Sequence, residues 1–555
     1  MAVSLLLFMG QSAKATTYYV RPIENTTAWN NIPGASIYTL AAGNAFAFDA
    51  TYTAADTYYF AAGLYTASPS ITIIMGKLYG GFSGNETEID LNVRATTDKD
   101  GNGTVEPWEF ANETIITGNG LFATTGSSQR DFITVIGGEI NGITLQNHNY
   151  SGATPGTITL GLLTNTPTIA DDIDENKGKM TLCTVKQLKS ASLGTVMFTN
   201  KNSVIDRCLI EECVTTVRAA GSVIYLPIVG GQILNSVIRN NIATGSSSLG
   251  AIYATTSSTN SDNGTGNMNV IVQNCVIYNN SAVYGSAVRA MAQTGKRGIQ
   301  IINCTFANNK NTSSVPGYSS VDLQGSGTFV NSIVVNDAQT ELRPATANGY
   351  ISNSAYEALY AGTSANIWPG NDMAAEKVAA DFYFMSNSST AGAMISGLAL
   401  SNPFVQADYD AIRKANFNIT AMESVALTTA GLKVLPTNYL VGGSGASISH
   451  TASIPSTDIL GVSRPLTTEG HLDLGAYQYS GVTGINDTFN TTSKIYAVNN
   501  GININDAIDK MVKVYSVSGQ MIKSIILSSN NQTIPASKGI YIVKVNSKVV
   551  KVIVK

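Results

Sequence analysis

Charge is scarce in this sequence. Only 13% of its 555 residues are charged, whereas a typical soluble domain carries about 25%. The 33 Lys and Arg nearly balance the 37 Asp and Glu, which leaves a net charge of −4. This composition excludes a charge-rich disordered chain and a basic nucleic-acid-binding surface, so we expect no nucleic-acid partner.

Histidine and cysteine are also few. Five Cys in a chain of this length do not make a disulfide framework. The three His, His148, His450 and His471, have no mutual spacing typical of a triad or a metal cluster, and we expect them in loops. The acidic run Asp171–Glu175 lies in a polar stretch and predicts a solvated loop. We therefore expect no catalytic residues.

Long apolar runs are missing as well. No segment approaches the roughly 18 apolar residues of a membrane helix, so we do not expect an integral membrane protein. The chain opens on a short apolar run, Ala2 to Gly10, followed by small residues at Ala13 and Ala15. This pattern predicts a signal peptide over residues 1–15 and export to the extracellular space or the outer-membrane surface. A buried first strand is the alternative.

What the sequence does contain is a repeat. The phrases IDRCLIEEC, ILNSVIRNN, VQNCVIYNN, IINCTFANN and FVNSIVVND recur at spacings of 28, 39, 29 and 28 residues. A second set of phrases, including GTVMFT, GSVIYL and GAIYAT, interleaves with the first. A period in the high twenties predicts a solenoid, and two short β-branched strands per repeat favour a parallel β-helix over a helical repeat.

Two positions of the repeat have a predicted role. Cysteine or serine fills one of them in six rungs: Cys183, Cys208, Ser236, Cys275, Cys304 and Ser332. Residues two apart, such as Cys304 and Phe306, share a strand face, so we expect these thiols to be inert core residues rather than metal ligands. The preceding residue, usually Asn, is predicted at a bend between strands, where its tolerance of left-handed backbone and its amide serve the turn.

The segment DKDGNGTVEPWE, residues 98–109, resembles an EF-hand calcium loop at every ligand position. Gly103 stands at the sharp turn, and Pro107 is compatible with the start of an exiting helix. The predicted ligands of a structural Ca²⁺ ion are Asp98, Asp100, Asn102, Thr104, Glu106 and Glu109. The alternative is a solvated turn rich in Asp, Asn and Gly.

The C-terminal end follows a different pattern. A Gly-, Asn- and Thr-rich linker over 481–495 precedes a segment, 496–555, in which apolar residues alternate with Lys or polar residues. That segment has 8 Lys and 2 Asp, a net charge of +6, so the rest of the chain carries about −10. The alternation predicts a small antiparallel β-sandwich, and the charge asymmetry marks a separate module.

Several of these motifs resemble known families. YYVRP, KLYGGFSGNETEIDLNVRA and the FANN-like repeats resemble secreted right-handed β-helix proteins of Bacteroidetes, which are similar to the chlamydial polymorphic membrane proteins. The phrase that closes such coils is matched at Asp458, Gly461, Arg464, Asp473, Gly475 and Ala476. The resemblance implies a right-handed parallel β-helix over 16–480, with Arg464 and Asp473 paired or capping in the closing turn. The region 336–430 shows no clear repeat and is expected to be irregular coils or an insertion.

The last segment resembles the C-terminal sorting domain of the type IX secretion system. The matching phrases are VYSVSGQ and KGIYIVKV, followed by a Lys-rich terminal strand. The resemblance implies an all-β sorting or anchoring module and a partner in the bacterial outer-membrane secretion machinery.

Two functions remain open at this stage. We favour a non-catalytic adhesin or scaffold that binds a glycan or a host surface protein, with Tyr253, Tyr278 and Tyr284 as aromatic contacts, although core stacking would also explain these residues. The rival is a polysaccharide lyase or glycoside hydrolase on a β-helix. Such an enzyme needs paired carboxylates, or Ca²⁺-holding acids beside an Arg or Lys base. Aligned rungs place no acids above Glu211, where Arg239 and Tyr278 stand instead.

Overall fold

The computed structural model divides the chain into two compact units, Met1–Gln478 and Tyr479–Lys555. It describes these residues: 15–40, 52–53, 56–66, 71–100, 105–118, 132–150, 157–161, 176–191, 193–216, 221–227, 230–255, 267–292, 296–307, 309–312, 320–324, 327–335, 342–343, 349–352, 354–356, 382–384, 434–435, 438–441, 446–464, 466, 472, 475–478, 494–498, 500–505, 511–517, 520–529, 531–545 and 548–554. The predicted signal peptide lies almost wholly outside them, as do His471, Asp473 and the run Asp171–Glu175.

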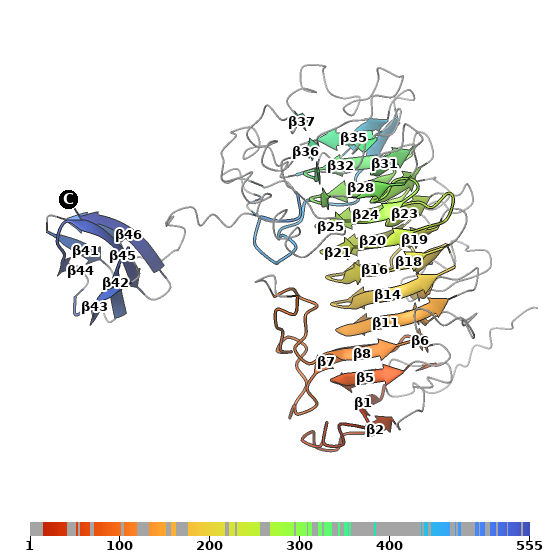
Figure 1. Cartoon of the computed structure of the whole chain (residues 1–555), viewed down its shortest axis with the longest axis horizontal. Coiled ribbons are helices and arrows are strands. Elements are labelled where there is room, and N and C mark those ends of the chain that lie inside the picture. Colours follow the sequence, from red (N-terminus) through yellow and green to blue (C-terminus); the bar gives the residue numbers. More distant parts are fainter. Residues whose placement is uncertain are drawn as a thin grey trace, which may run out of the picture. The chain divides into compact units, whose positions relative to one another are not determined.

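The first unit is a parallel β-helix, as predicted. Strands of successive coils stack in register to form three parallel sheets, and Figure 1 shows the stack from β2 to β35. Sheet 1 contains, in spatial order, β2 (Ile37–Leu40), β1 (Thr17–Pro22), β4 (Thr57–Ala61), β7 (Lys77–Phe82), β10 (Glu139–Asn141), β13 (Lys179–Thr181), β16 (Val204–Asp206), β20 (Gly230–Leu234), β24 (Asn269–Gln273), β28 (Ile299–Ile302), β32 (Gly327–Val330) and β35 (Gly349–Ser352).

Sheets 2 and 3 complete each coil. Sheet 2 contains β5 (Gly63–Thr66), β8 (Thr114–Thr117), β11 (Ile143–Tyr150), β14 (Thr184–Ser190), β17 (Leu209–Glu211), β18 (Val214–Thr215), β21 (Val237–Arg239), β22 (Ile242–Ala243), β25 (Val276–Tyr278), β26 (Ser281–Ala282), β29 (Thr305–Ala307), β30 (Lys310–Asn311), β33 (Ile333–Val335), β36 (Ser354–Tyr356) and β37 (Phe382–Phe384). Sheet 3 contains β3 (Tyr52–Thr53), β6 (Ile71–Ile74), β9 (Ile133–Ile136), β12 (Ile158–Leu160), β15 (Gly194–Phe198), β19 (Ser222–Leu226), β23 (Ile252–Thr255), β27 (Val288–Met291), β31 (Val321–Gln324) and β34 (Leu342–Arg343).

The sheets meet at tight corners that the repeat encodes. At corner 1, between sheets 1 and 2, one residue per coil has φ between 47° and 55°: Leu182, Arg207, Asn235, Asn274, Asn303 and Asn331. This confirms the predicted bend, because Asn accepts this left-handed backbone more readily than most residues do. Several of these amides also bond along the axis, as in the 3.0 Å contact from Asn274 Nδ2 to Asn235 Oδ1.

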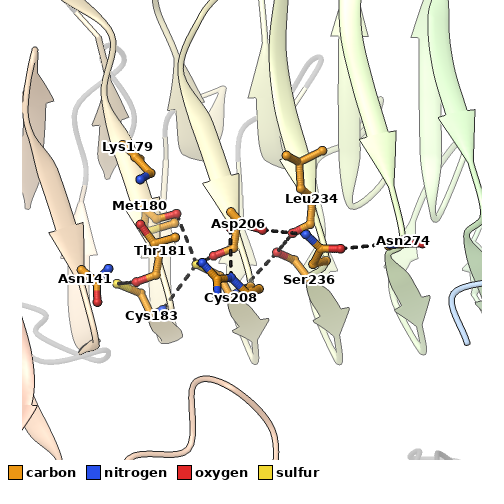
Figure 2. Close-up of polar contacts among 12 residues, drawn as sticks. Asn141, Lys179, Met180, Thr181, Cys183, Asp206, Cys208, Leu234, Ser236 and Asn274 are labelled. Atoms are coloured by element: carbon orange, nitrogen blue, oxygen red, sulfur yellow. Dashed lines mark hydrogen bonds and ion pairs between the residues drawn. The ribbon is translucent and has the colours of Figure 1, made fainter. Parts of the chain in front are cut away.

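The Cys and Ser residues follow corner 1 directly and are buried, as predicted. The backbone N–H of Cys208 donates to Ser236 Oγ at 3.0 Å, and the N–H of Cys304 donates to Ser332 Oγ at 3.1 Å. Figure 2 shows Cys183, Cys208 and Ser236 in consecutive coils. Cys208, Ser236 and Ser332 therefore each accept a backbone N–H of the preceding coil. Burial raises the pKa of the Cys208 thiol well above its ordinary value, which keeps it inert.

Corner 2, between the long and short strands of sheet 2, holds a second ladder that was not predicted from the sequence. Asn241, Asn280 and Asn309 are at most 1% exposed and stack in consecutive coils. Asn280 Oδ1 accepts from both the backbone N–H (3.1 Å) and Nδ2 (2.9 Å) of Asn241, and Asn309 Oδ1 does the same for Asn280 at 3.1 and 3.0 Å. Cys213 occupies the same place one coil earlier and donates its N–H to Asn241 Oδ1. The signal was present in the Asn-Asn pairs of IRNN, IYNN and FANN.

A strap, defined here as residues 446–464, crosses the outside of several coils. Gln300 Oε1 accepts from the N–H groups of Thr451 and Ala452 at 2.9 and 3.1 Å. The strap also covers Ile302 and Val330, outward-facing apolar residues of sheet 1, with Ile448 and Ile454. The segment that resembles the closing phrase thus packs back along the coil.

Two residues of the closing phrase organise that contact. Asp458, 2% exposed, accepts the N–H groups of Leu460 and Val462 through Oδ1 and that of Gln478 through Oδ2. Arg464 donates to Asn274 Oδ1 at 3.0 Å and to the Gly475 carbonyl at 3.1 Å. The expected Arg464–Asp473 pair falls partly outside the described residues, and the contact of Arg464 that the structure does show is with corner 1.

Three further features bear on the predictions. The coil continues into the region 336–430, where no repeat was recognised, because β34, β35 and β36 extend all three sheets. The antiparallel hairpin β38 (Asn438–Val441) and β39 (Ala446–Ser449) follows. None of the described segments forms a helix long and apolar enough to cross a membrane.

The second unit is an antiparallel sandwich, as predicted. One sheet contains β40 (Lys494–Val498), β41 (Gly501–Asn505) and β44 (Asn531–Pro535). The other contains, in spatial order, β43 (Met521–Ile526), β42 (Met511–Ser516), β45 (Gly539–Val545) and β46 (Lys548–Val554). Alternate residues such as Ile502, Val512 and Val543 meet in a core between the two sheets.

Replacing Asn280 with Ala tests the ladder at corner 2. The change leaves two buried donors of Asn241 without their acceptor, so we expect the β-helix to lose about 2–4 kcal/mol of unfolding free energy in urea titrations. The exposed Asn92, which bonds only locally to Asp90, serves as the control, and Asn92→Ala should change stability by less than about 0.5 kcal/mol. Equal effects of the two substitutions would contradict the role of the ladder.

Candidate metal and charge site

The candidate site lies on a long excursion between β7 and β8, residues 83–113, which we call the outer loop. Arg94 docks it on the coil: Nη1 donates to the Gly80 carbonyl and Nη2 to Asn141 Oδ1, both at 2.8 Å. The Arg94 guanidinium also lies 4.6 Å from the centre of the Phe110 ring. Burial lowers the pKa of Arg94 to about 10, so this residue still carries its charge at neutral pH.

The outer loop brings three of the predicted calcium ligands together. One carboxylate oxygen each of Asp98, Asp100 and Glu109 lies within 4.8 Å of the others. Glu106 is buried nearby but is not part of this trio, while Asn102 and Thr104 lie outside the described residues. Carboxylate oxygens converging in this way are the donor type that Ca²⁺ prefers.

Glu109 is fixed in place by hydrogen bonds from the backbone of the outer loop. Its side chain is buried, and Oε1 accepts the N–H groups of Lys99 and Asp100 at 3.0 and 3.3 Å, while Oε2 accepts that of Glu106 at 2.8 Å. Its position is therefore set by the backbone of the outer loop. Oε2 accepts only one of these N–H groups and keeps a further lone pair, so these bonds are compatible with metal ligation through that oxygen.

The ends of the loop differ from an EF-hand. An isolated antiparallel bridge joins Thr96 to Phe110, and the described residues after Pro107 form a turn rather than the exiting helix that the motif suggested. No room remains for a helix between Pro107 and the start of β8 at Thr114, because Trp108 and Phe110 are already buried against the coil. The resemblance to an EF-hand is thus confined to the loop itself.

Asp100 also reaches a row of side chains on sheet 2. The strand register places Lys186, Glu211, Arg239 and Tyr278 at equivalent outward positions of successive coils. Arg239 Nη1 lies 3.6 Å from Asp100 Oδ2, its Nε donates to Glu211 Oε2 at 2.7 Å, and Nη1 donates to the Tyr278 hydroxyl at 3.0 Å. The repeat in the sequence aligns Glu211 with Arg239, but no local pattern in the sequence predicts that Asp100 reaches them.

This cluster is charged and well shielded. The side chains of Arg239 and Glu211 are 12% and 15% exposed, and that of Asp100 is 24% exposed. Burial alone would disfavour the cation, but Tyr278 and Glu211 raise the pKa of Arg239 above its ordinary value. Arg239 therefore stays protonated at any pH the protein would meet, so it can orient carboxylates or bind an anion but cannot serve as a base.

Other candidate residues have structural roles. Tyr253 and Tyr278 are 6% and 1% exposed, so the core or ladder alternative holds for them, and Tyr253 stacks on Tyr225 with ring centres 5.4 Å apart. His148 is buried with its ring stacked on Phe132, and His450 Nε2 lies 3.1 Å from Thr328 Oγ1. The expectation that these two His lie in loops is wrong for His148, which belongs to β11.

Comparisons with known proteins give one family match and a similar solved structure. Residues 483–554 match the family model described as a domain of unknown function, DUF6383. The chain is also similar to a solved structure, the catalytic domain of a GH87 alpha-1,3-glucanase in complex with tetrasaccharides, at 12% identity and a TM-score of 0.26. That match covers 56% of this chain and 65% of the glucanase chain. No curated protein matches the sequence.

The sheet topology and the DUF6383 match together define a class: a parallel β-helix protein with a C-terminal antiparallel module whose sequence matches DUF6383.

Proposed function

We propose that this chain is an exported β-helix scaffold, secreted or displayed at the cell surface, which binds a glycan or a host surface protein without cleaving it. The observation that carries this proposal is the use of polar side chains in the coil. Cys208, Cys304, Asn241 and Asn280 bond to a buried Ser or Asn of the next coil, so these polar groups are used to stabilise the scaffold.

The export part of the proposal rests on the two ends of the sequence. Residues 1–15 serve as a signal peptide, and the Lys-rich second unit serves as a sorting or anchoring module recognised by the outer-membrane secretion machinery. The separate core of the second unit supports a module that is handled independently of the β-helix.

The outer loop is the proposed calcium site. Asp98, Asp100 and Glu109 would supply carboxylate oxygens, and a bound Ca²⁺ would neutralise three acids that otherwise repel one another. Because Asp100 also faces Arg239, the ion would hold the tip of the loop against sheet 2. The role of the ion in this proposal is structural.

A second candidate function has one observation in its favour. Asp100, one of the acid trio, lies against Arg239, and Arg239 also pairs with Glu211. Acids able to hold Ca²⁺ thus lie beside an Arg, the combination that a polysaccharide-cleaving enzyme would require. Against this candidate stand the charge and the ion pairs of Arg239, because a guanidinium that stays protonated and lies against two carboxylates cannot act as the base. We therefore retain cleavage as the rival.

Calorimetric titration with Ca²⁺ tests the metal site. We expect one ion to bind the full chain with a dissociation constant on the order of 10⁻⁴ to 10⁻³ M, the range of extracellular calcium modules. Asp98→Asn removes one charged ligand and should weaken binding at least about tenfold. Asp90→Asn, in the same loop but bonded to Asn92, is the matched control and should bind as the wild type does. Identical heats for wild type and Asp98→Asn would remove the proposed site.

A glycan panel tests the scaffold against the enzyme. We expect binding to at least one glycan with no release of reducing ends. Reducing-end release that disappears in Glu211→Gln or Arg239→Gln would instead establish the rival function.

A further inference from the structure

β43 is an edge strand of the second unit with an open side. The sheet order is β43, β42, β45, β46, and the opposite edge strand, β46, packs against β40 and β41 of the other sheet. Among the residues that the structure describes, β43 pairs only with β42. Its outer edge therefore offers backbone N–H and C=O groups to another strand.

The side chains of β43 are unusually apolar for such an edge. Met521, Ile522 and Ile526 are 55%, 54% and 60% exposed, and the remaining residues of the strand are exposed or half-buried. Natural sheets protect open edges with charges, prolines or covering segments, because an apolar edge attracts other strands. A single charge, Lys523, stands in this strand.

A pocket of about 440 Å³ opens beside this edge. β43 contributes Ile522 and Lys523, the neighbouring strand contributes Val514, and the far side is formed by residues 534–537 and Tyr541. The pocket is thus largely apolar with one cation at its lining. An edge that offers backbone groups next to a side-chain pocket is the arrangement by which domains bind extended peptides: the backbone provides affinity and the pocket provides selectivity.

Charge decides what kind of strand fits. The unit carries a net charge of +6 between Tyr496 and Lys555. Lys513 and Lys544 stand directly opposite each other on β42 and β45, and they add positive charge to the outer face of the same sheet. A second copy of the chain would bring its own Lys523 and the same positive charge to the edge. An acidic partner would instead be attracted by Lys523 and by the net positive charge of the unit.

We propose that the edge of β43 and the adjoining pocket form a docking groove for an extended segment of another protein. The segment adds to the sheet by backbone hydrogen bonds, places an apolar side chain in the pocket and sets a carboxylate against Lys523. This proposal concerns the second unit only. It holds whether the β-helix binds or cleaves glycans, and whether or not the unit is a sorting signal.

Hydrogen exchange of the full chain tests the groove. The probe is a capped synthetic heptapeptide, Thr-Phe-Thr-Glu-Thr-Val-Thr, which presents Phe, Glu and Val on one face of a strand. At millimolar peptide, we expect the amides of Met521–Ile526 to exchange at least about threefold more slowly. The same peptide with Lys in place of Glu should give no protection, because its cation meets Lys523.

A charge swap makes the result specific. In Lys523→Glu the preference should reverse, so that the Lys-containing peptide protects β43 and the Glu-containing peptide does not. Lys551→Glu, an exposed lysine on the opposite edge strand, is the matched control and should keep the wild-type preference.

Three results would overturn the proposal. The first is the absence of protection with either peptide, and the second is protection that the charge swap leaves unchanged. The third is protection of β43 that rises with protein concentration alone, which would identify a second copy as the occupant.

Discussion

In-register stacking of coils is the constraint on which the β-helix depends. Each coil repeats at the strand spacing of about 4.8 Å, so every corner residue lies directly above the corner residue of the neighbouring coil. A buried polar group at a corner can then be satisfied by the same position one coil away. At corner 1 the N–H of Cys208 is satisfied by the Ser236 hydroxyl, and at corner 2 the amide of Asn241 is satisfied by Asn280. The repeat in the sequence is the consequence of that requirement.

The segments outside the coil depend on the same corners. The outer loop and the strap arise more than 300 residues apart, yet each places an arginine on an asparagine at or next to corner 1. Arg94 bonds Asn141 Oδ1 at 2.8 Å, and Arg464 bonds Asn274 Oδ1 at 3.0 Å. In both cases the coil presents a fixed amide oxygen, and an Arg donates to it while also binding a backbone carbonyl. Two of the few charged residues of this protein, Arg94 and Arg464, thus fasten outer segments to a coil whose corner residues are mostly uncharged.

Most of the fold could be predicted from the sequence because its rules are local. The left-handed corner at Asn235, the inward Cys208 and the alternation of the second unit all follow from patterns a few residues long. The contact between Asp100 and Arg239 could not be predicted, since it depends on how far the outer loop extends along the stack. The bond from Arg464 to Asn274 had no local signal for the same reason. For the calcium site, the motif predicted the approach of Asp98, Asp100 and Glu109, while the bridge at Thr96 and the missing exit helix follow from the return to β8.

Native-state hydrogen exchange of the full chain would test the central claim, that the coil is stabilised by its own corner ladders and that the other segments are docked onto it. The account predicts that the amides of Cys208, Asn241, Asn280 and Cys304 are the slowest to exchange and open only with global unfolding of the β-helix. Amides of the outer loop and the strap should open at lower free energy and independently of the corners. Corner amides that lose protection as soon as the strap or the outer loop opens would contradict the account.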